Sequence, residues 1–120
     1  PSDVASVWKE LCRRSVPFLD LDVEFYPAAR WWGRGIGGIP VEVDVVAKSI
    51  DGKILMVGEC KWIEKADINK ISAELAKKAV SLPFAEEHTI ISVLFLKNRP
   101  AISPSGIFIF GPEDVVEALK

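Results

Sequence analysis

The sequence has few of the residues that build structural zinc sites or disulfide frameworks. Its 120 residues include two cysteines, Cys12 and Cys60, and a single histidine. The cysteines lie far apart and form no CxxC or Cys/His spacing, which argues against a structural zinc site. Such sparse cysteine usage is typical of a reducing compartment, so we expect a cytoplasmic protein.

Long apolar runs and nucleotide-binding motifs are also missing. No run of about 18 apolar residues occurs, so no membrane helix is expected, and the sequence contains no GxxxxGK[ST] phosphate loop. The start, Pro1-Ser2-Asp3, has neither an initiator Met nor a signal peptide. This start suggests a domain cut from a longer chain, although a removed tag or a processed terminus would look the same.

The sequence has no excess of basic charge. Its formal net charge is −2, whereas nucleic-acid binders usually carry a net basic field. This charge balance argues against a strong stand-alone DNA binder. If some of the carboxylates bind a metal ion, the argument is weaker but still holds. With 49% hydrophobic residues the chain can form a core, and its length predicts one domain over residues 1–120.

Hydrophobic periodicity predicts an α/β domain with a mixed central sheet flanked by helices. The expected elements are a helix over 3–16, a strand over 21–29, an aromatic and basic loop over 30–38, strands over 40–48 and 53–62, a helix over 66–80, strands over 89–97 and 107–110, and a helix opened by 111–114. The predicted order is therefore α-β-β-β-α-β-β-α.

The most informative feature is the predicted hairpin around the Asp51-Gly52 turn. If the turn has two central residues, Asp44 lies opposite Glu59, and Glu42 lies opposite Lys61. Since side chains alternate along a strand, these four charges share one face. The other face then carries Val41, Val43, Val45, Met56, Cys60 and Trp62. An odd-length loop would instead slip the register and separate the charges.

The opposed acids Asp44 and Glu59 are unusual in a structural sheet, because like charges directly opposed destabilise a strand pair. A Mg²⁺ or Mn²⁺ ion would resolve the repulsion, since hard cations prefer carboxylate oxygens. Lys61 would then hold or polarise an attacking water, or offset charge at a phosphate. The alternative is an exposed hairpin face with an ordinary Glu–Lys pair, and for Glu42 we prefer that alternative.

Asp44, followed fifteen residues later by Glu59-Cys60-Lys61, resembles the signature of the PD-(D/E)xK nuclease superfamily. The resemblance implies a restriction-endonuclease-like fold and a metal-dependent nuclease site with Asp44, Glu59 and Lys61. It further implies that the backbone carbonyl of Cys60 completes the metal shell. In that superfamily the first helix often supplies another acid, for which Glu10 is the candidate, although a helix commonly carries such a Glu on its wet side.

A closer resemblance rests on three segments, namely Arg30–Arg34 (RWWGR), Val41–Ala47 (VEVDVVA) and Gly58–Trp62 (GECKW). This set is similar to the C-terminal domain of a family of archaeal P-loop AAA-type ATPases, over residues 5–110. It implies an ATPase module in the same full-length chain. Archaeal Holliday-junction resolvases are more distant relatives by fold.

The aromatic and basic segment supplies the candidate nucleic-acid contacts. Arg30 and Arg34 could contact phosphates or be merely solvated. Trp31 and Trp32 could stack on bases, with Trp31 the candidate contact, or pack the sheet edge, which we favour. The lysines of the second predicted helix and its approach look like a solvated face: Lys65, Lys70, Lys77 and Lys78.

Two functional hypotheses follow. The first is a Mg²⁺- or Mn²⁺-dependent endonuclease domain that hydrolyses DNA phosphodiesters, branched DNA included. The second is a catalytically silent module of the same fold, which docks DNA or a protein. Homodimerisation through an exposed sheet or helix face is a weaker, third hypothesis.

Overall fold

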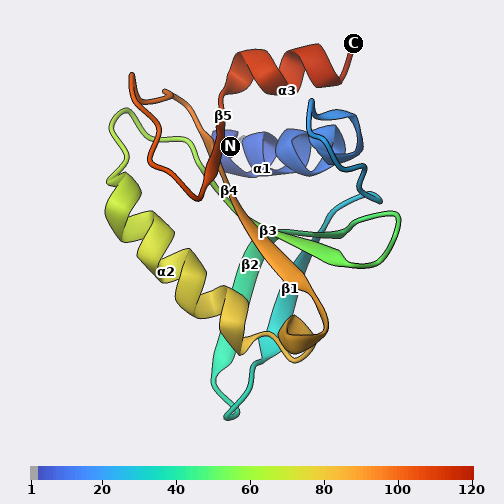
Figure 1. Ribbon diagram of the computed structural model, residues 1–120. Coiled ribbons are helices and arrows are strands. Elements are labelled where there is room, and N and C mark those ends of the chain that lie inside the picture. Colours follow the sequence, from blue (N-terminus) through green and yellow to red (C-terminus); the bar gives the residue numbers. More distant parts are fainter. Residues whose placement is uncertain (1–2) are drawn as a thin grey trace.

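The computed structural model describes residues 3–120, which form one five-stranded mixed sheet with helices on both faces (Figure 1). The strands are β1 (Ala29–Arg34), β2 (Pro40–Lys48), β3 (Ile54–Lys61), β4 (Thr89–Leu96) and β5 (Phe108–Phe110). The helices are α1 (Val4–Ser15), α2 (Ile68–Ser81) and α3 (Pro112–Ala118), with short 3₁₀ turns at Val16–Phe18 and Ala85–Glu87. The predicted α/β class and element order are confirmed.

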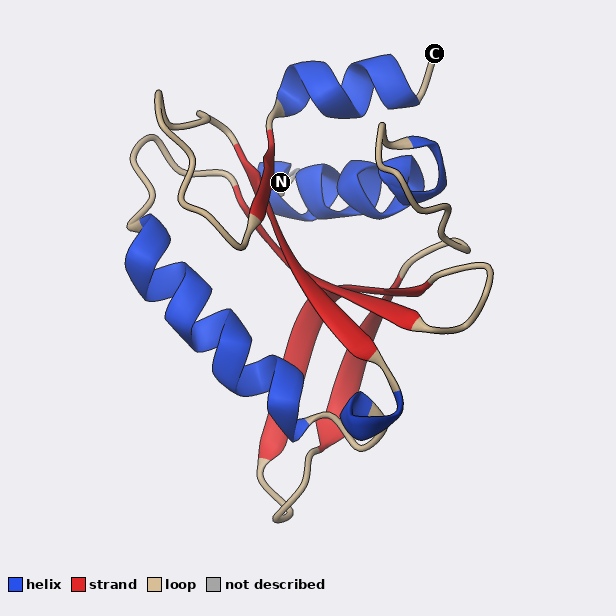
Figure 2. Cartoon of the chain, in the orientation of Figure 1, coloured by secondary structure: helices blue, strands red, loops and turns tan. Residues whose placement is uncertain are grey.

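The sheet order is β1-β2-β3-β4-β5. The first three strands form an antiparallel meander, whereas β3, β4 and β5 run parallel. Helix α2 connects β3 to β4 and covers one face of the sheet, while α1 and α3 lie together over the other face (Figure 2). The hairpin of β1 and β2 extends past the helices as an arm.

The sheet separates two apolar clusters, because its inner strands are covered on both faces. The cluster beneath α1 and α3 contains Trp8, Cys12, Val16, Val45, Ala47, Met56, Cys60, Val93, Phe95 and Val115. The cluster beneath α2 contains Val43, Leu55, Val57, Ile71, Leu75, Ala79, Leu82, Leu94, Leu96 and Ile109. Neighbouring β4 residues alternate between the clusters, which explains the nearly continuous apolar run there.

Side-chain caps fix where the longer helices begin. Asp3 accepts a hydrogen bond from the Ala5 amide at 3.1 Å, so α1 begins at Val4. Asp67 accepts one from the Lys70 amide at 3.2 Å, so α2 begins at Ile68, two residues later than predicted. None of the helices within residues 3–120 is long and apolar enough to cross a bilayer.

The first strand lies elsewhere than the sequence predicted. The 21–28 stretch is irregular, with a single bridge between Phe25 and Ser49, and Pro27 lacks the amide that would continue a ladder. The strand is Ala29–Arg34, within the segment expected to be a loop. The glycines of this segment favoured the prediction of a loop. In the structure only Gly37 and Gly38, with φ of 87° and 79°, form the tight turn.

The predicted hairpin register is confirmed from Val45 opposite Gly58 to Lys48 opposite Leu55. The predicted division of faces is wrong beyond this point, because β2 contains a bulge. Ala29 pairs with Val46 and Trp31 with Val43, so two residues of β2 oppose the single residue Arg30. The bulge reverses the alternation.

The consequence of the bulge is visible in the packing of β2. Val41 and Val43 pack in the cluster beneath α2, whereas Val45 packs in the cluster beneath α1. Glu42 therefore lies on the opposite face from Lys61 rather than beside it. Asp44 sits at the bulge itself, where a side chain can be aimed away from the regular pleat.

Candidate functional site

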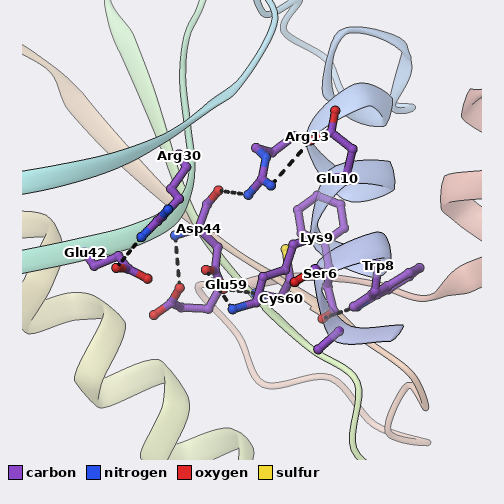
Figure 3. A network of polar contacts seen from close by, with 12 residues as sticks. Ser6, Trp8, Lys9, Glu10, Arg13, Arg30, Glu42, Asp44, Glu59 and Cys60 are labelled. Carbon is purple, nitrogen blue, oxygen red and sulfur yellow. Dashed lines mark hydrogen bonds and ion pairs between the residues drawn. The ribbon is translucent and has the colours of Figure 1, made fainter. Parts of the chain in front are cut away.

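Asp44 and Glu59 lie where β2 and β3 separate (Figure 3). Regular pairing between these strands ends at Val45 and Gly58. In the gap, the Asp44 amide donates to Glu59 Oε2 at 3.2 Å, and the Cys60 amide donates to Asp44 Oδ2 at 2.9 Å. Carboxylate oxygens thus replace the carbonyls of a continued ladder, and this satisfies amides that burial would otherwise leave unpaired.

Both carboxylates are buried, and each has a lysine partner. Asp44 is 5% exposed and Glu59 is 7% exposed. Lys9 Nζ of α1 lies 3.3 Å from Asp44 Oδ1, and Lys78 Nζ of α2 lies 2.6 Å from Glu59 Oε1. The acids therefore reach toward opposite faces of the sheet and meet in the gap between the strands. Buried carboxylates are destabilising unless a cation lies nearby, and the two lysines provide the cations.

The two carboxyl groups have opposite pKa shifts. Burial raises the pKa of Glu59, and the nearby charge of Asp44 raises it further against the opposing effect of Lys78. Burial alone would raise the pKa of Asp44 too, but the Cys60 amide, the hydrogen bond with Glu59 and Lys9 together lower it. Of the pair, Glu59 is therefore the group that takes up a proton first as the pH falls.

Cys60 offers its backbone rather than its thiol. The thiol is buried beside Cys12, and burial raises its pKa well above the ordinary value, so it stays neutral and is a poor nucleophile. The Cys60 amide points into the gap toward Asp44. In an extended strand the carbonyl of a residue points to the same side as its amide, so the Cys60 carbonyl also faces the gap.

The gap between the strands offers oxygen donors of the type that hard divalent cations prefer. The donors available at the gap are oxygens of Asp44, Glu59 and the Cys60 carbonyl, as Mg²⁺ and Mn²⁺ prefer. The lysine partners Lys9 and Lys78 have side chains about a third exposed, at 35% and 36%, so they have room to move aside. Within residues 3–120, no cluster of three or more Asp, Glu, His or Cys side chains is arranged to hold a metal. The carbonyl and water would therefore complete the shell.

The structure does not bring Glu10 to this pair. Glu10 bonds to Arg14 Nε at 3.2 Å and Arg13 at 3.5 Å, on the solvent side of α1. In Figure 3 its carboxylate points away from Asp44. Glu42 likewise has its own partner, Arg30, at 2.7 Å. Neither acid contacts Asp44 or Glu59, so neither is a direct ligand in this arrangement.

Lys61 shares a face of β3 with Glu59, two residues away. It lies opposite Leu96 of β4 and is partly exposed. Among the described residues its ammonium group has no ion-pair partner within 4 Å, in contrast to Lys78. Lys61 is therefore a neighbour of Glu59 on one face of β3 and is available for another group, such as a phosphate oxygen or a water molecule.

The predicted nucleic-acid contacts separate into two kinds. Trp31 packs inward, with its ring 5.9 Å from that of Phe84, as the packing interpretation expects. Trp32 is instead the exposed tryptophan, at 66%. Arg30 lies 4.8 Å from the centre of the Trp32 ring, and Arg34 donates to the Gly38 carbonyl at 2.8 Å while remaining exposed.

The sequence analysis missed the two lysines that contact the acids. Lys78 was expected on a solvated face, but it lies between Leu75 and Leu82 on the buried stripe of α2. A charged residue on an apolar stripe is a signal that could have identified it. Lys9 similarly precedes the buried Cys12 by three residues on α1, at the margin of the helix face that contacts the sheet.

Comparison with known proteins bears on the family of the chain but not on its activity. No curated protein matches the chain. Residues 3–72, more than half of the 120, match the model of the DUF234 family, described as archaea bacterial proteins of unknown function. The matched region includes Lys9, Asp44, Glu59 and Lys61, and it ends before Lys78. The chain therefore belongs to the DUF234 family.

Proposed function

We propose that this chain is a Mg²⁺- or Mn²⁺-dependent endonuclease domain that hydrolyses DNA phosphodiester bonds. The observation that carries the proposal is the pair of buried carboxylates, Asp44 and Glu59. Each accepts a hydrogen bond from a backbone amide of the other's strand, at 2.9 Å for Asp44 and 3.2 Å for Glu59. A stable fold gains little from two acids in one buried gap, whereas a divalent metal requires them. The resemblance of Asp44, Glu59 and Lys61 to the PD-(D/E)xK signature supports the same activity and a restriction-endonuclease-like fold.

In this proposal Asp44, Glu59 and the Cys60 carbonyl hold the metal. When bound, the metal lowers the pKa of a coordinated water and offsets negative charge at the phosphate. Lys61 positions the attacking water or neutralises a phosphate oxygen, since its ammonium group lies on the same face as Glu59. Hydrolysis adds the water oxygen to phosphorus and breaks the opposite ester bond, whose oxygen leaves with a proton.

Lys9 and Lys78 hold the acids in place before the metal arrives. Their ammonium groups lie 3.3 and 2.6 Å from Asp44 and Glu59. Each offsets a carboxylate charge that would otherwise be buried unpaired. By its resemblance to the C-terminal domain of archaeal ATPases, we also propose that the domain acts with an ATPase module of the same full-length chain.

A second candidate function is a silent module of this fold that docks DNA or a protein. The two lysine partners favour it, because Lys9 and Lys78 already neutralise the acids without any metal. The two functions differ in what Asp44 must do. In a silent module, replacing Asp44 changes stability alone.

The test is cleavage of labelled single-stranded, duplex, flapped and four-way-junction DNA with Mg²⁺ or Mn²⁺. Asp44→Asn and Lys61→Ala should abolish cleavage, while Glu42→Gln, exposed on the arm and bonded to Arg30, should retain it. Metal-dependent cleavage that is as fast in Asp44→Asn as in the parent would contradict the assigned site. Absence of cleavage of every substrate, together with absence of Mn²⁺ binding, would leave the silent module.

A further inference from the structure

The outward face of β1 presents alternating basic and aromatic side chains. Arg30, Trp32 and Arg34 point away from the core, whereas Trp31 and Gly33 are partly buried. β1 is the edge strand of the sheet, and the arm that it forms with β2 extends past the helices (Figure 1). This face is therefore open to a ligand along its whole length.

Trp32 is the feature of this face that needs an explanation. The indole of Trp32 is 66% exposed and leaves a large apolar surface in water, whereas the ring of Trp31 points to the other face of the strand and packs against Phe84. The Arg30 guanidinium lies 4.8 Å from its ring centre, which holds the indole by a cation–π contact. The aromatic surface therefore lies beside positive charge.

A hollow of about 500 Å³ continues from this face toward α1. Its basic residues are Arg13, Arg14 and Arg30, and its remaining walls are largely apolar. Together with Arg34, four of the five arginines in the sequence lie along this hollow and β1. Two glutamates, Glu10 and Glu42, offset part of this charge.

The arginines adjoin the acidic pair. Arg13 lines the hollow and donates from Nη1 to the Asp44 backbone carbonyl at 3.0 Å (Figure 3). A phosphate backbone bound along Arg34, Arg30 and Arg13 would therefore arrive beside Asp44. We name this surface the arginine–tryptophan face, defined by Arg13, Arg14, Arg30, Trp32 and Arg34.

We infer that the arginine–tryptophan face binds a single-stranded nucleic acid, with one base stacked on Trp32 and the adjacent phosphates on the arginines. This inference rests on the proposed nuclease function and names its substrate class. An exposed indole gains affinity by stacking on a base, but only an unpaired base can leave its neighbours to do so. Duplex DNA offers phosphates to the arginines and no free base face to Trp32.

Binding is tested without cleavage, by fluorescence anisotropy of labelled oligothymidylate in EDTA at low salt. A duplex of the same length and a uridine RNA oligomer serve as comparison ligands. Trp32→Ala should weaken single-strand binding by about tenfold or more, since 1.4 kcal/mol is a factor of ten. Trp32→Phe should stay within about threefold of the parent, and duplex binding should change little in either variant.

The arginines are tested by salt dependence. Arg30→Gln and Arg34→Gln should each reduce the slope of log affinity against log salt by about 0.7, the value expected per phosphate on a single strand. Arg99→Gln is the matched control, because Arg99 pairs with Asp114 of α3 at 3.3 Å and is not one of the residues that define this face. It should keep the parental slope.

Single-strand affinity equal in Trp32→Ala and the parent would overturn the inference, as would equal losses for single strand and duplex. RNA binding equal to that of DNA would keep the stacking site and assign it to either polymer. The outcome is separable from the nuclease proposal. Metal-dependent cleavage that needs Asp44, together with single-strand affinity that does not depend on Trp32, would refute only the single-strand inference. Trp32-dependent binding without metal-dependent cleavage of any DNA would refute only the nuclease.

Discussion

Asp44 and Glu59 are held by each other's strands. The Asp44 amide donates to Glu59 at 3.2 Å, and the amide that follows Glu59, that of Cys60, donates to Asp44 at 2.9 Å. Because of this reciprocal arrangement, loss of the Asp44 carboxylate leaves the Cys60 amide unpaired, and loss of the Glu59 carboxylate leaves the Asp44 amide unpaired. Experiments at this site therefore need variants that preserve the acceptor oxygen.

Metal binding should depend on Asp44 and not on Glu10. We expect Mn²⁺ to bind the parent chain in isothermal titration calorimetry and to fail to bind Asp44→Asn, which loses one anionic ligand. Glu10→Gln should bind Mn²⁺ as the parent does, because Glu10 is directed to Arg13 and Arg14 on the solvent side. Loss of binding in Glu10→Gln would mean that α1 rearranges to deliver this acid.

The stability of the metal-free chain should rise as the pH falls from neutral toward 4.5. The pKa of Glu59 is raised in the folded state from an ordinary value of 4.5, so the folded chain takes up the proton before the unfolded chain does. Glu59→Gln should lack this rise. Urea unfolding at several pH values in EDTA measures it, and a Glu59→Gln profile parallel to that of the parent would contradict the assignment.

Asp44 gives a stability change of the opposite sign at lower pH. Its pKa is lowered in the folded state from 3.8, so the stability that it contributes is present above that value and is lost as the pH falls through the folded pKa. The window between neutral pH and 4.5 therefore reports on Glu59 with little interference from Asp44.

Lys78 should stabilise the metal-free chain through its ion pair with Glu59, and bound Mn²⁺ should take the place of its ammonium group. Lys78→Met leaves the Glu59 carboxylate without its partner at 2.6 Å, so we expect a loss of about 1–2 kcal/mol in the free energy of unfolding, because the Lys78 side chain is about a third exposed and the pair is partly screened by solvent. The exposed neighbour Lys77→Met should change it by less than about 0.5 kcal/mol.

Thermal unfolding with and without Mn²⁺ then separates two roles for Lys78. If the metal takes the place of the ammonium group, Mn²⁺ should raise the melting temperature of Lys78→Met more than that of the parent. An equal rise in both proteins would mean that the metal and Lys78 do not compete for Glu59.

The adjacent tryptophans should differ sharply in their contribution to stability. Trp31→Ala removes a ring that packs against Phe84, and we expect a loss of about 2–3 kcal/mol. Trp32→Ala removes an exposed ring and should cost less than about 1 kcal/mol, mainly the contact with Arg30. Chemical denaturation measures both. Similar losses would contradict the inward and outward placement of these rings.

The sequence predicted those parts of the fold that depend on periodicity and on turn chemistry. The strand over 40–48 was predicted with its observed limits, and the Asp51-Gly52 turn gave the observed register from Val45 to Lys48. The bulge at Asp44 was not predictable, because no residue there breaks the alternation of Val41, Val43 and Val45. Strand β1 was missed since Gly33 and the glycines that follow the strand resemble those of a loop, while the two tryptophans of β1 favour a strand.

The part of the candidate site that could be predicted is the part formed within a single hairpin. Asp44 and Glu59 come together through one local hairpin, and its register follows from a short turn. Lys9 and Lys78 come from two helices that are far apart in the sequence and lie on opposite faces of the sheet, so they reach the acids only through tertiary packing. A helical pattern gives the face on which a lysine lies, but not the group that it meets across the core.

Because of the bulge in β2, deleting a residue at this position should have a different effect on the arm from substituting one. Two residues, Asp44 and Val45, fill the interval that Arg30 spans alone. Deleting one of them would straighten the strand and turn every preceding residue of the arm half a revolution, so that Glu42 would face α2 and Val43 would face solvent. A family member with one residue fewer here would carry an inverted arm, even with all its charged residues present.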